Sequence, residues 1–127
     1  MMRFLLIAAL LGGLPAGSGA GPLISRESHP AINWQSLDDF ATAHGGLEGQ
    51  RLTVLGPWLG ADRDMFNAVL AHFAEATGAV AHYSGSDSFE QQVVIGAEAG
   101  APPDIAMFPQ PGLAADLARE GKLVPLD

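Results

Sequence analysis

With 127 residues, 48% of them hydrophobic and 16% charged, the chain has the composition of a folded domain or part of one, and not of a disordered segment. Six Lys and Arg residues stand against fourteen Asp and Glu residues, which gives a formal net charge of −8. An acidic chain without a basic cluster is a poor partner for nucleic acid or for an anionic membrane surface.

The first twenty residues have the pattern of a secretory signal peptide. Arg3 provides the positive start, the stretch from Phe4 to Leu14 is apolar, and Ser18 and Ala20 are the small residues that precede a cleavage site. The apolar stretch is shorter than the about 20 residues of a membrane-spanning helix, so an uncleaved anchor is the weaker alternative. The chain has no cysteine to form a disulfide or carry a lipid. We therefore expect a periplasmic protein that is released after cleavage.

Residues 21–50 are predicted to form an N-terminal arm with one short helix. The polar segment 21–35 is expected to be extended, and Ser36 is the expected N-cap of a helix over 36–44. The glycines at 45–46 would end this helix. Its buried stripe would consist of Leu37, Phe40 and Ala41.

From residue 51 onward, short apolar runs alternate with segments of helical periodicity. The run 52–56 predicts a buried strand, Asp62 is the expected N-cap of the next helix, and Gly78 its end. The apolar face of that helix would consist of Phe66, Val69, Leu70 and Phe73. A second strand is predicted over 79–84.

The C-terminal part repeats this alternation. Asp87 and Glu90 resemble a capping pair for a helix that runs to about Ala97, with Phe89 and Val93 facing inward. A third strand is predicted over 104–108. A last helix would begin at Pro111 and end at Gly121, with Leu113 and Leu117 on its buried face.

The order of these elements predicts an α/β fold with a mostly parallel β-α-β-α-β sheet. In open parallel sheets, ligands bind beyond the carboxyl ends of the strands. The segments that follow the three predicted strands are 56–58, 84–87 and 108–110. We therefore expect any ligand to lie against these three loops.

The residues of these loops favour binding of a carbohydrate. The ring of Trp58 could stack on a sugar, while Ser84, Ser86, Asp87 and Gln110 could form hydrogen bonds with hydroxyl groups. Three of these residues have a structural alternative. Trp58 could pack within the loop or against a second lobe, and Ser86 and Asp87 could cap the helix that follows them.

Signatures of catalysis and of cofactor binding are missing from the sequence. Neither G-x-G-x-x-G, nor the phosphate-binding G-x-x-x-x-G-K-[ST], nor G-x-S-x-G occurs. The four histidines, at positions 29, 44, 72 and 82, lack the spacing of metal ligands. We therefore predict a binding protein without enzymatic activity, cofactor or metal ion.

Three segments resemble extracellular solute-binding proteins of bacterial ABC sugar importers, in particular the α-glucoside-binding type. They are LEGQRLTVLGPWLGADRDMF (47–66), AEATGAVAHYSGSDSFEQQV (74–93) and APPDIAMFPQPGLAADLAREGKLVPLD (101–127). The resemblance covers about residues 36–127 and implies a two-lobed fold that closes on a sugar and delivers it to a permease in the inner membrane. It also implies a monomer, with binding loops at Trp58, Ser86–Asp87 and Gln110. Members of this family are about three times as long, so residues 51–127 are expected to be an incomplete first lobe, in a fragment of the parent protein.

Three other classes of protein remain open at this point. The solute could be an oligopeptide, a polyamine or a metal, although a cation would require several convergent carboxylates. An exported α/β hydrolase would need a nucleophile and a base, and no such pair is visible. A small exported adaptor would have to be stable as a chain of this length.

Overall fold

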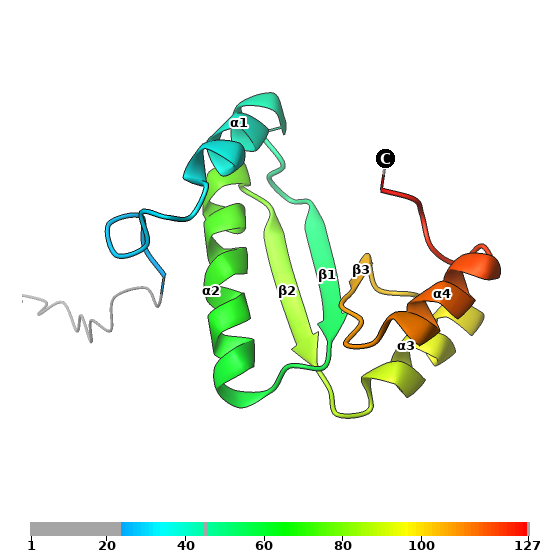
Figure 1. Ribbon diagram of the computed structural model, residues 1–127. Helices are drawn as coiled ribbons and strands as arrows, with labels where there is room; N and C mark the ends of the chain where they lie inside the picture. The colour runs from blue at the N-terminus through cyan, green and yellow to red at the C-terminus, as the bar shows by residue number, and fades with distance from the viewer. Residues whose placement is uncertain (1–23, 45, 127) are drawn as a thin grey trace, which may run out of the picture.

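The computed structural model describes residues 24–44 and 46–126. The predicted signal peptide, residues 1–20, and its cleavage site lie outside the described residues. Figure 1 shows the elements in chain order, which are α1 (Trp34–His44), β1 (Arg51–Gly56), α2 (Gly60–Thr77), β2 (Val80–Gly85), α3 (Phe89–Glu98), β3 (Ile105–Ala106) and α4 (Pro111–Arg119).

The strands form one parallel sheet in the order β2-β1-β3. Arg51 is paired with Val80 and Gly56 with Gly85, so β1 and β2 run side by side over their whole length. On the other side, Val54 is paired with Ile105 and only two residues of β3 take part. The predicted α/β fold with a parallel sheet is confirmed. The central place of β1 agrees with its short apolar run, which suits a strand that has a neighbour on each side.

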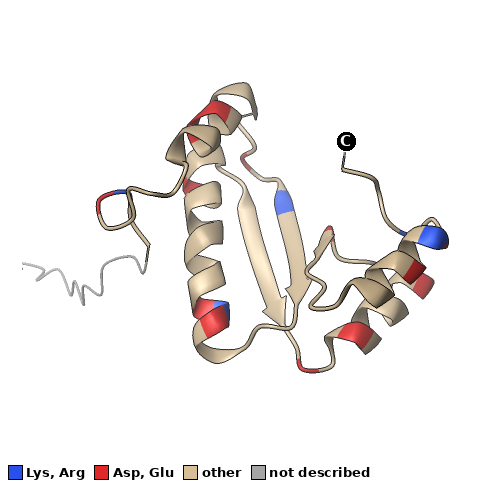
Figure 2. Cartoon of the chain, viewed as in Figure 1, with Lys and Arg blue, Asp and Glu red and all other residues tan. Residues whose placement is uncertain are grey.

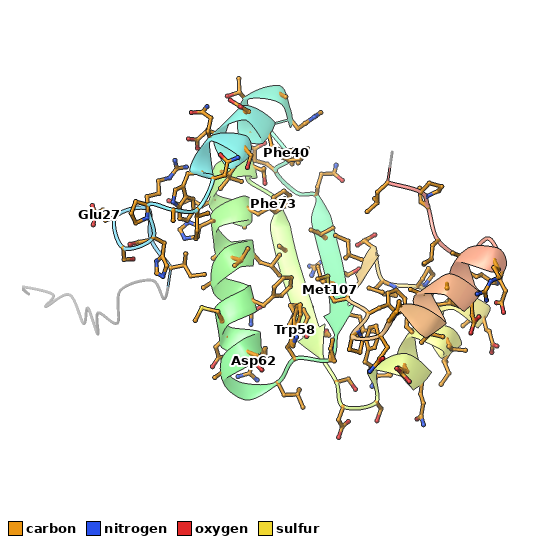
Figure 3. The ribbon with its side chains drawn as sticks, viewed as in Figure 1. Glu27, Phe40, Trp58, Asp62, Phe73 and Met107 are labelled. Carbon is orange, nitrogen blue, oxygen red and sulfur yellow. The ribbon has the colours of Figure 1, made fainter. Side chains whose placement is uncertain are left out.

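The helices lie on both sides of this sheet. Figure 1 shows α2 alongside β2 on one side, and α3 and α4 next to β3 on the other. The rings of Phe66 on α2 and Tyr83 on β2 meet edge to face, with their centroids 5.0 Å apart. Helix α1 packs on α2 through Phe40 and Phe73, whose ring centroids are 5.9 Å apart (Figure 3).

The most deeply buried side chains form a cluster between the sheet and the two C-terminal helices. Phe89, Val93 and Leu117 are 2%, 3% and 5% exposed, and Leu55 and Ala106 of the sheet pack against them. The inward orientation predicted for Phe89, Val93 and Leu117 is therefore confirmed. These residues fix the position of α3, which carries much of the candidate site described below.

The apolar faces predicted for α1 and α2 are only partly buried. Phe40 is 41% exposed and Val69 is 49% exposed, whereas the prediction placed both in the core. Within the described residues α1 has no fully buried side chain. Helical periodicity identifies the apolar positions of a helix, but it does not show how much of that stripe a neighbouring element covers.

Three predicted helix caps are wrong. Helix α1 begins at Trp34, two residues before Ser36, and the side chain of Asn33 accepts the backbone N–H of Ser36 at 3.3 Å. Helix α2 begins at Gly60, so Asp62 lies in its first turn and not at the N-cap. Asp87 does not cap α3 either, because the N-cap position is Ser88 and no side chain there bonds a backbone N–H.

The helix ends were predicted more accurately than the starts. Gly78 follows α2 with φ of +79° and donates its backbone N–H to Ala74 O at 2.8 Å. Pro111 is the first residue of α4, and Gly121 turns the chain after this helix with φ of +70°. Left-handed backbone is accessible to glycine at little cost, so these stop signals are local and readable from the sequence.

The N-terminal arm is not the extended segment that the sequence predicts. From Ile24 to Asn33 it forms turns that pack against α1 and α2. Ile24 is 7% exposed, and its carbonyl oxygen lies 2.8 Å from Nε2 of His72. The guanidinium of Arg26 pairs with Asp38 and lies 5.2 Å from the centre of the Trp34 ring. These contacts fasten the arm to the helices.

Charged residues are distributed over helices, loops and strand β1 in Figure 2. One of them connects two strands. Asp104, just before β3, accepts hydrogen bonds from the backbone N–H and the hydroxyl of Thr53 on β1, both at 2.7 Å. The backbone N–H of Asp104 donates in return to Thr53 Oγ1 at 3.1 Å. These hydrogen bonds hold the residue before β3 against β1. The strand predicted over 104–108 is shorter than expected, because β3 comprises only Ile105–Ala106.

The hydrogen bonds between Asp104 and Thr53 should make the stability of the fold depend on pH under acidic conditions. Hydrogen bonds from Thr53 lower the pKa of Asp104 below its ordinary value of 3.8. A carboxyl with a lowered pKa in the folded state stabilises the fold above its unfolded pKa, and this contribution is lost as the pH falls through the folded pKa. Asp104→Asn should therefore lower the Tm at pH 7. As the pH falls below about 4, the Tm of this variant should decrease less than that of the wild type.

Asp38, whose pKa is lowered by its hydrogen bond with Arg26, should preserve part of the acid dependence in that variant. Thermal unfolding followed by circular dichroism between pH 7 and pH 2 measures both effects. A wild-type slope in the Asp104→Asn variant would contradict the role given to Asp104.

Candidate functional site

The carboxyl ends of the three strands meet at one edge of the sheet. Beyond β1 and β2, the backbone N–H of Ser86 donates to Gly56 O at 2.9 Å. Beyond β3, the N–H of Met107 donates to Leu55 O, also at 2.9 Å. The loops after the strands are thus held next to one another, as expected for parallel strands.

A cavity of about 280 Å³ lies at this edge. Each of the three loops contributes to its wall, and the first turn of α3 provides the rest. It is lined by Pro57, Asp87, Ser88, Phe89, Glu90, Gln91 and Pro109. We call this the edge cavity. It has a hydrophobic floor at Phe89, two proline rings at its sides, and carboxylate, hydroxyl and amide groups at its rim.

The polar groups of the edge cavity are concentrated at the start of α3. Asp87 and Glu90 are exposed, and the hydroxyl of Ser88 donates to Asp87 Oδ1 at 3.2 Å. Carboxylates accept hydrogen bonds in two directions from each oxygen, so they bind hydroxyl and ammonium donors and repel anions. Gln91 adds a group that can both donate and accept.

Trp58 does not line the edge cavity. Its ring packs on two aromatic neighbours, with its centroid 5.0 Å from that of Phe66 on α2 and 6.1 Å from that of Tyr83 on β2. The Trp58 N–H donates to the Tyr83 hydroxyl at 2.8 Å, and that hydroxyl donates to Trp58 O at 3.2 Å. The tryptophan therefore fastens the loop between β1 and α2, which is the packing alternative that the sequence left open.

The other predicted site residues are placed differently. Ser84 lies on the exposed face of β2, with its hydroxyl 3.3 Å from His82 Nε2. Ser86 Oγ accepts the backbone N–H of Ser88 at 3.1 Å and the side-chain amide of Gln92 at 2.8 Å, so it orders the turn before α3. Gln110 is exposed at the N-cap position of α4, next to Pro109.

Of the five predicted residues, only Asp87 lines the edge cavity. Pro57, Glu90 and Gln91 line the edge cavity but are not among the site residues that the sequence predicts. Glu90 is exposed in the first turn of α3, where the sequence pattern indicates only a capping role. Glu90 and Gln91 lie in the first turn of α3, which begins at Phe89, two residues after Asp87 at the predicted edge of the sheet.

Two glycines make the close approach of these loops possible. A Cβ on Gly85 would lie 2.0 Å from Trp58 O, and a Cβ on Gly56 would lie 2.8 Å from the Tyr83 hydroxyl. Neither position has room for a side chain. The strand ends that carry the site therefore depend on glycine at both positions.

A second cavity, of about 500 Å³, lies between the N-terminal arm, α1 and α2. Arg26, Asp38, His72 and Glu75 are among its lining residues. Arg26 and Asp38 pair with each other there, and His72 contacts Ile24 O, so these groups already serve the attachment of the arm. This cavity is larger, but it lies away from the strand ends, and we assign the candidate site to the edge cavity.

Within residues 24–44 and 46–126, no group of three or more His, Cys, Asp or Glu side chains is arranged to hold a metal ion. Over the same ranges, none of the helices combines the length and the apolar character needed to cross a bilayer.

Comparison with known proteins identifies two relatives. The chain is 54% identical over 95 residues to the alpha-glucosides-binding periplasmic protein AglE of Rhizobium meliloti, which covers 75% of this chain and 20% of AglE. It is 47% identical over 83 residues to the osmoprotective compounds-binding protein GgtB of Synechocystis, which covers 65% of this chain and 20% of GgtB. The chain is homologous to solute-binding proteins. This confirms the resemblance that the sequence motifs indicated.

The homology to solute-binding proteins has a limited extent. The chain spans about a fifth of the length of the two relatives. No family model matches it, and no solved structure matches it. The relatives are binding proteins by name, and the parallel sheet is consistent with part of one lobe of such a protein.

Proposed function

We propose that the chain is the part of an ABC-transporter solute-binding protein that carries one wall of the solute site, and that the site takes neutral sugars of the α-glucoside type. The observation that carries this proposal is the edge cavity, where three strand ends and the first turn of α3 present Asp87, Ser88, Glu90 and Gln91 together. The name of AglE, an alpha-glucosides-binding protein, supports a sugar, and the name of GgtB gives osmoprotective compounds as its solutes.

The chemistry of the edge cavity fits a neutral sugar better than an anion. Sugar hydroxyls donate hydrogen bonds to carboxylates and accept them from amide and hydroxyl groups, and all three kinds are present. Pro57 and Pro109 offer apolar surface to the C–H faces of a sugar ring. Asp87 and Glu90 would repel a phosphorylated or carboxylated sugar.

The same proposal covers the domain organisation of the protein, its location and its partners. Residues 51–127 form part of the first lobe, and residues 21–50 are the arm and short helix that precede it. The protein acts as a monomer in the periplasm after removal of residues 1–20, and it delivers its sugar to an inner-membrane permease without catalysing a reaction. Trp58 and Ser86 contribute by holding the loops that carry the site, and Ser84 and Gln110 contribute from its periphery.

The test is an affinity series measured by two-dimensional NMR on the ¹⁵N-labelled chain, which also detects weak, millimolar binding. Trehalose and methyl α-glucoside should bind, and glucose 1-phosphate should bind at least about tenfold more weakly because of the two carboxylates. Asp87→Asn should weaken trehalose binding about tenfold, as expected when one hydrogen bond to a charged group is lost.

Asp39→Asn is the matched control, since Asp39 is an exposed carboxylate on α1 that accepts a hydrogen bond from Gln35, away from the cavity. Its trehalose affinity should equal that of the wild type. Spermidine tests the cationic alternative, because paired carboxylates also attract ammonium groups. Binding of spermidine without binding of trehalose would replace a sugar by a polyamine as the proposed solute.

A further inference from the structure

A groove between α3 and α4 adjoins the edge cavity. It measures about 470 Å³ and is lined by Glu90, Gln91, Val94, Ile95 and Leu113. We call it the α3–α4 groove. Val94 and Leu113 form its base, where they pack on the core cluster, and Ile95 is 63% exposed at its side. Beyond Glu90 and Gln91, all of its lining side chains are aliphatic.

The edge cavity and the α3–α4 groove are continuous. Glu90 and Gln91 line both of them. In a helix, side chains four residues apart lie on the same face, so Val94 and Ile95 continue the surface that Glu90 and Gln91 begin. A molecule seated between Asp87 and Glu90 can therefore reach Ile95 without leaving the surface of α3.

The size of the two hollows supports a common occupant. Small-molecule sites commonly measure about 300–1,000 Å³. The edge cavity, at about 280 Å³, falls just below this range, whereas the two hollows together lie within it. The combined surface has a polar end made of carboxylates and an apolar end made of aliphatic side chains.

Resting on the proposed function, we propose that this site takes α-glucosides whose second part is apolar, with the sugar ring in the edge cavity and an aryl or alkyl aglycone in the α3–α4 groove. Glu90 and Gln91 lie at the junction, where they can bind the hydroxyls next to the glycosidic bond. Val94, Ile95 and Leu113 offer no hydrogen-bonding group, so the second ring of a disaccharide such as trehalose would gain less affinity there than an apolar aglycone. An apolar aglycone has no hydroxyl groups that would lose hydration.

The test compares methyl α-glucoside with phenyl α-glucoside by NMR titration of the ¹⁵N-labelled chain. Phenyl α-glucoside should bind about tenfold more tightly, equivalent to about 1.4 kcal/mol, and it should shift the amide signals of residues 94–95 and 113. Ile95→Ser should remove most of this gain and leave the affinity for methyl α-glucoside unchanged. Because Ile95 is largely exposed, this variant keeps the core intact.

Val69→Ser is the matched control, because Val69 is another exposed β-branched residue in the middle of a helix, on α2 and away from the groove. It should preserve the preference for the phenyl glycoside. Equal affinities for the two glycosides, or an Ile95→Ser variant that retains the gain, would overturn the proposal and leave the proposed function in place. If neither glycoside binds, both this proposal and the proposed function are overturned.

Discussion

Gly85→Ala should destabilise the chain by about 3 kcal/mol or more, at the upper end of what overpacking costs. The added Cβ would lie 2.0 Å from Trp58 O, and this atom belongs to the backbone and cannot rotate away. Relief requires β2 to separate from the loop after β1. That movement would break the contacts between the Tyr83 hydroxyl and the backbone of Trp58. Urea unfolding followed by circular dichroism measures the change in the free energy of unfolding.

Gly112→Ala is the control for this substitution and should have the opposite sign. Gly112 lies within α4, its φ is not positive, and a Cβ there would meet no atom within 4 Å. Replacing glycine by alanine inside a helix stabilises it by about 0.5–1 kcal/mol. Equal effects of the two substitutions would contradict the close packing of the loops at the strand ends.

Phe89→Ala should cost about 3–5 kcal/mol, the range expected for a buried phenylalanine. Phe89 is 2% exposed and its ring meets that of Phe108 edge to face, with centroids 5.4 Å apart. The substitution would open a hole beneath the edge cavity and detach α3 from the sheet. In a chain with few fully buried side chains among its described residues, a loss of this size approaches the total stability of a small domain, about 5–15 kcal/mol.

Phe40→Ala provides the comparison, because Phe40 is 41% exposed and packs on Phe73 between α1 and α2. Its removal should cost about 1–2 kcal/mol, as expected for a side chain that is only partly buried. Chemical denaturation of both variants gives the two values. A larger loss for Phe40 than for Phe89 would mean that the α1–α2 contact, and not the α3 cluster, holds the fold together.

The sequence predicted those features of the fold that depend on neighbouring residues. The apolar run of β1, the periodicity of α2 and the glycine at position 78 are local signals, and the order of the elements was enough to predict the parallel sheet and the edge at which the loops meet. Helix starts were predicted less well, because Asp62 and Asp87 are as favourable in a first turn, or just before it, as they are at an N-cap.

The site was harder to predict, since its members are assembled by contacts between distant parts of the chain. Trp58 follows a strand at the expected edge, but Tyr83, 25 residues later, turns it into a packing residue. Asp104 is fixed by Thr53, 51 residues earlier. Which loop residues line the edge cavity depends on where α3 begins, and the N-cap is Ser88 instead of the predicted Asp87, a shift of one residue.

The most direct test of the central claim is to map where a sugar binds. Backbone amide shifts of the assigned ¹⁵N-labelled chain would be recorded during titration with trehalose. The largest changes are expected around the edge cavity, at residues 57–58, 87–91 and 109–110. No change up to high millimolar trehalose, or changes centred on the cavity formed by Arg26, Asp38 and Glu75, would contradict the assignment of this edge as a solute site.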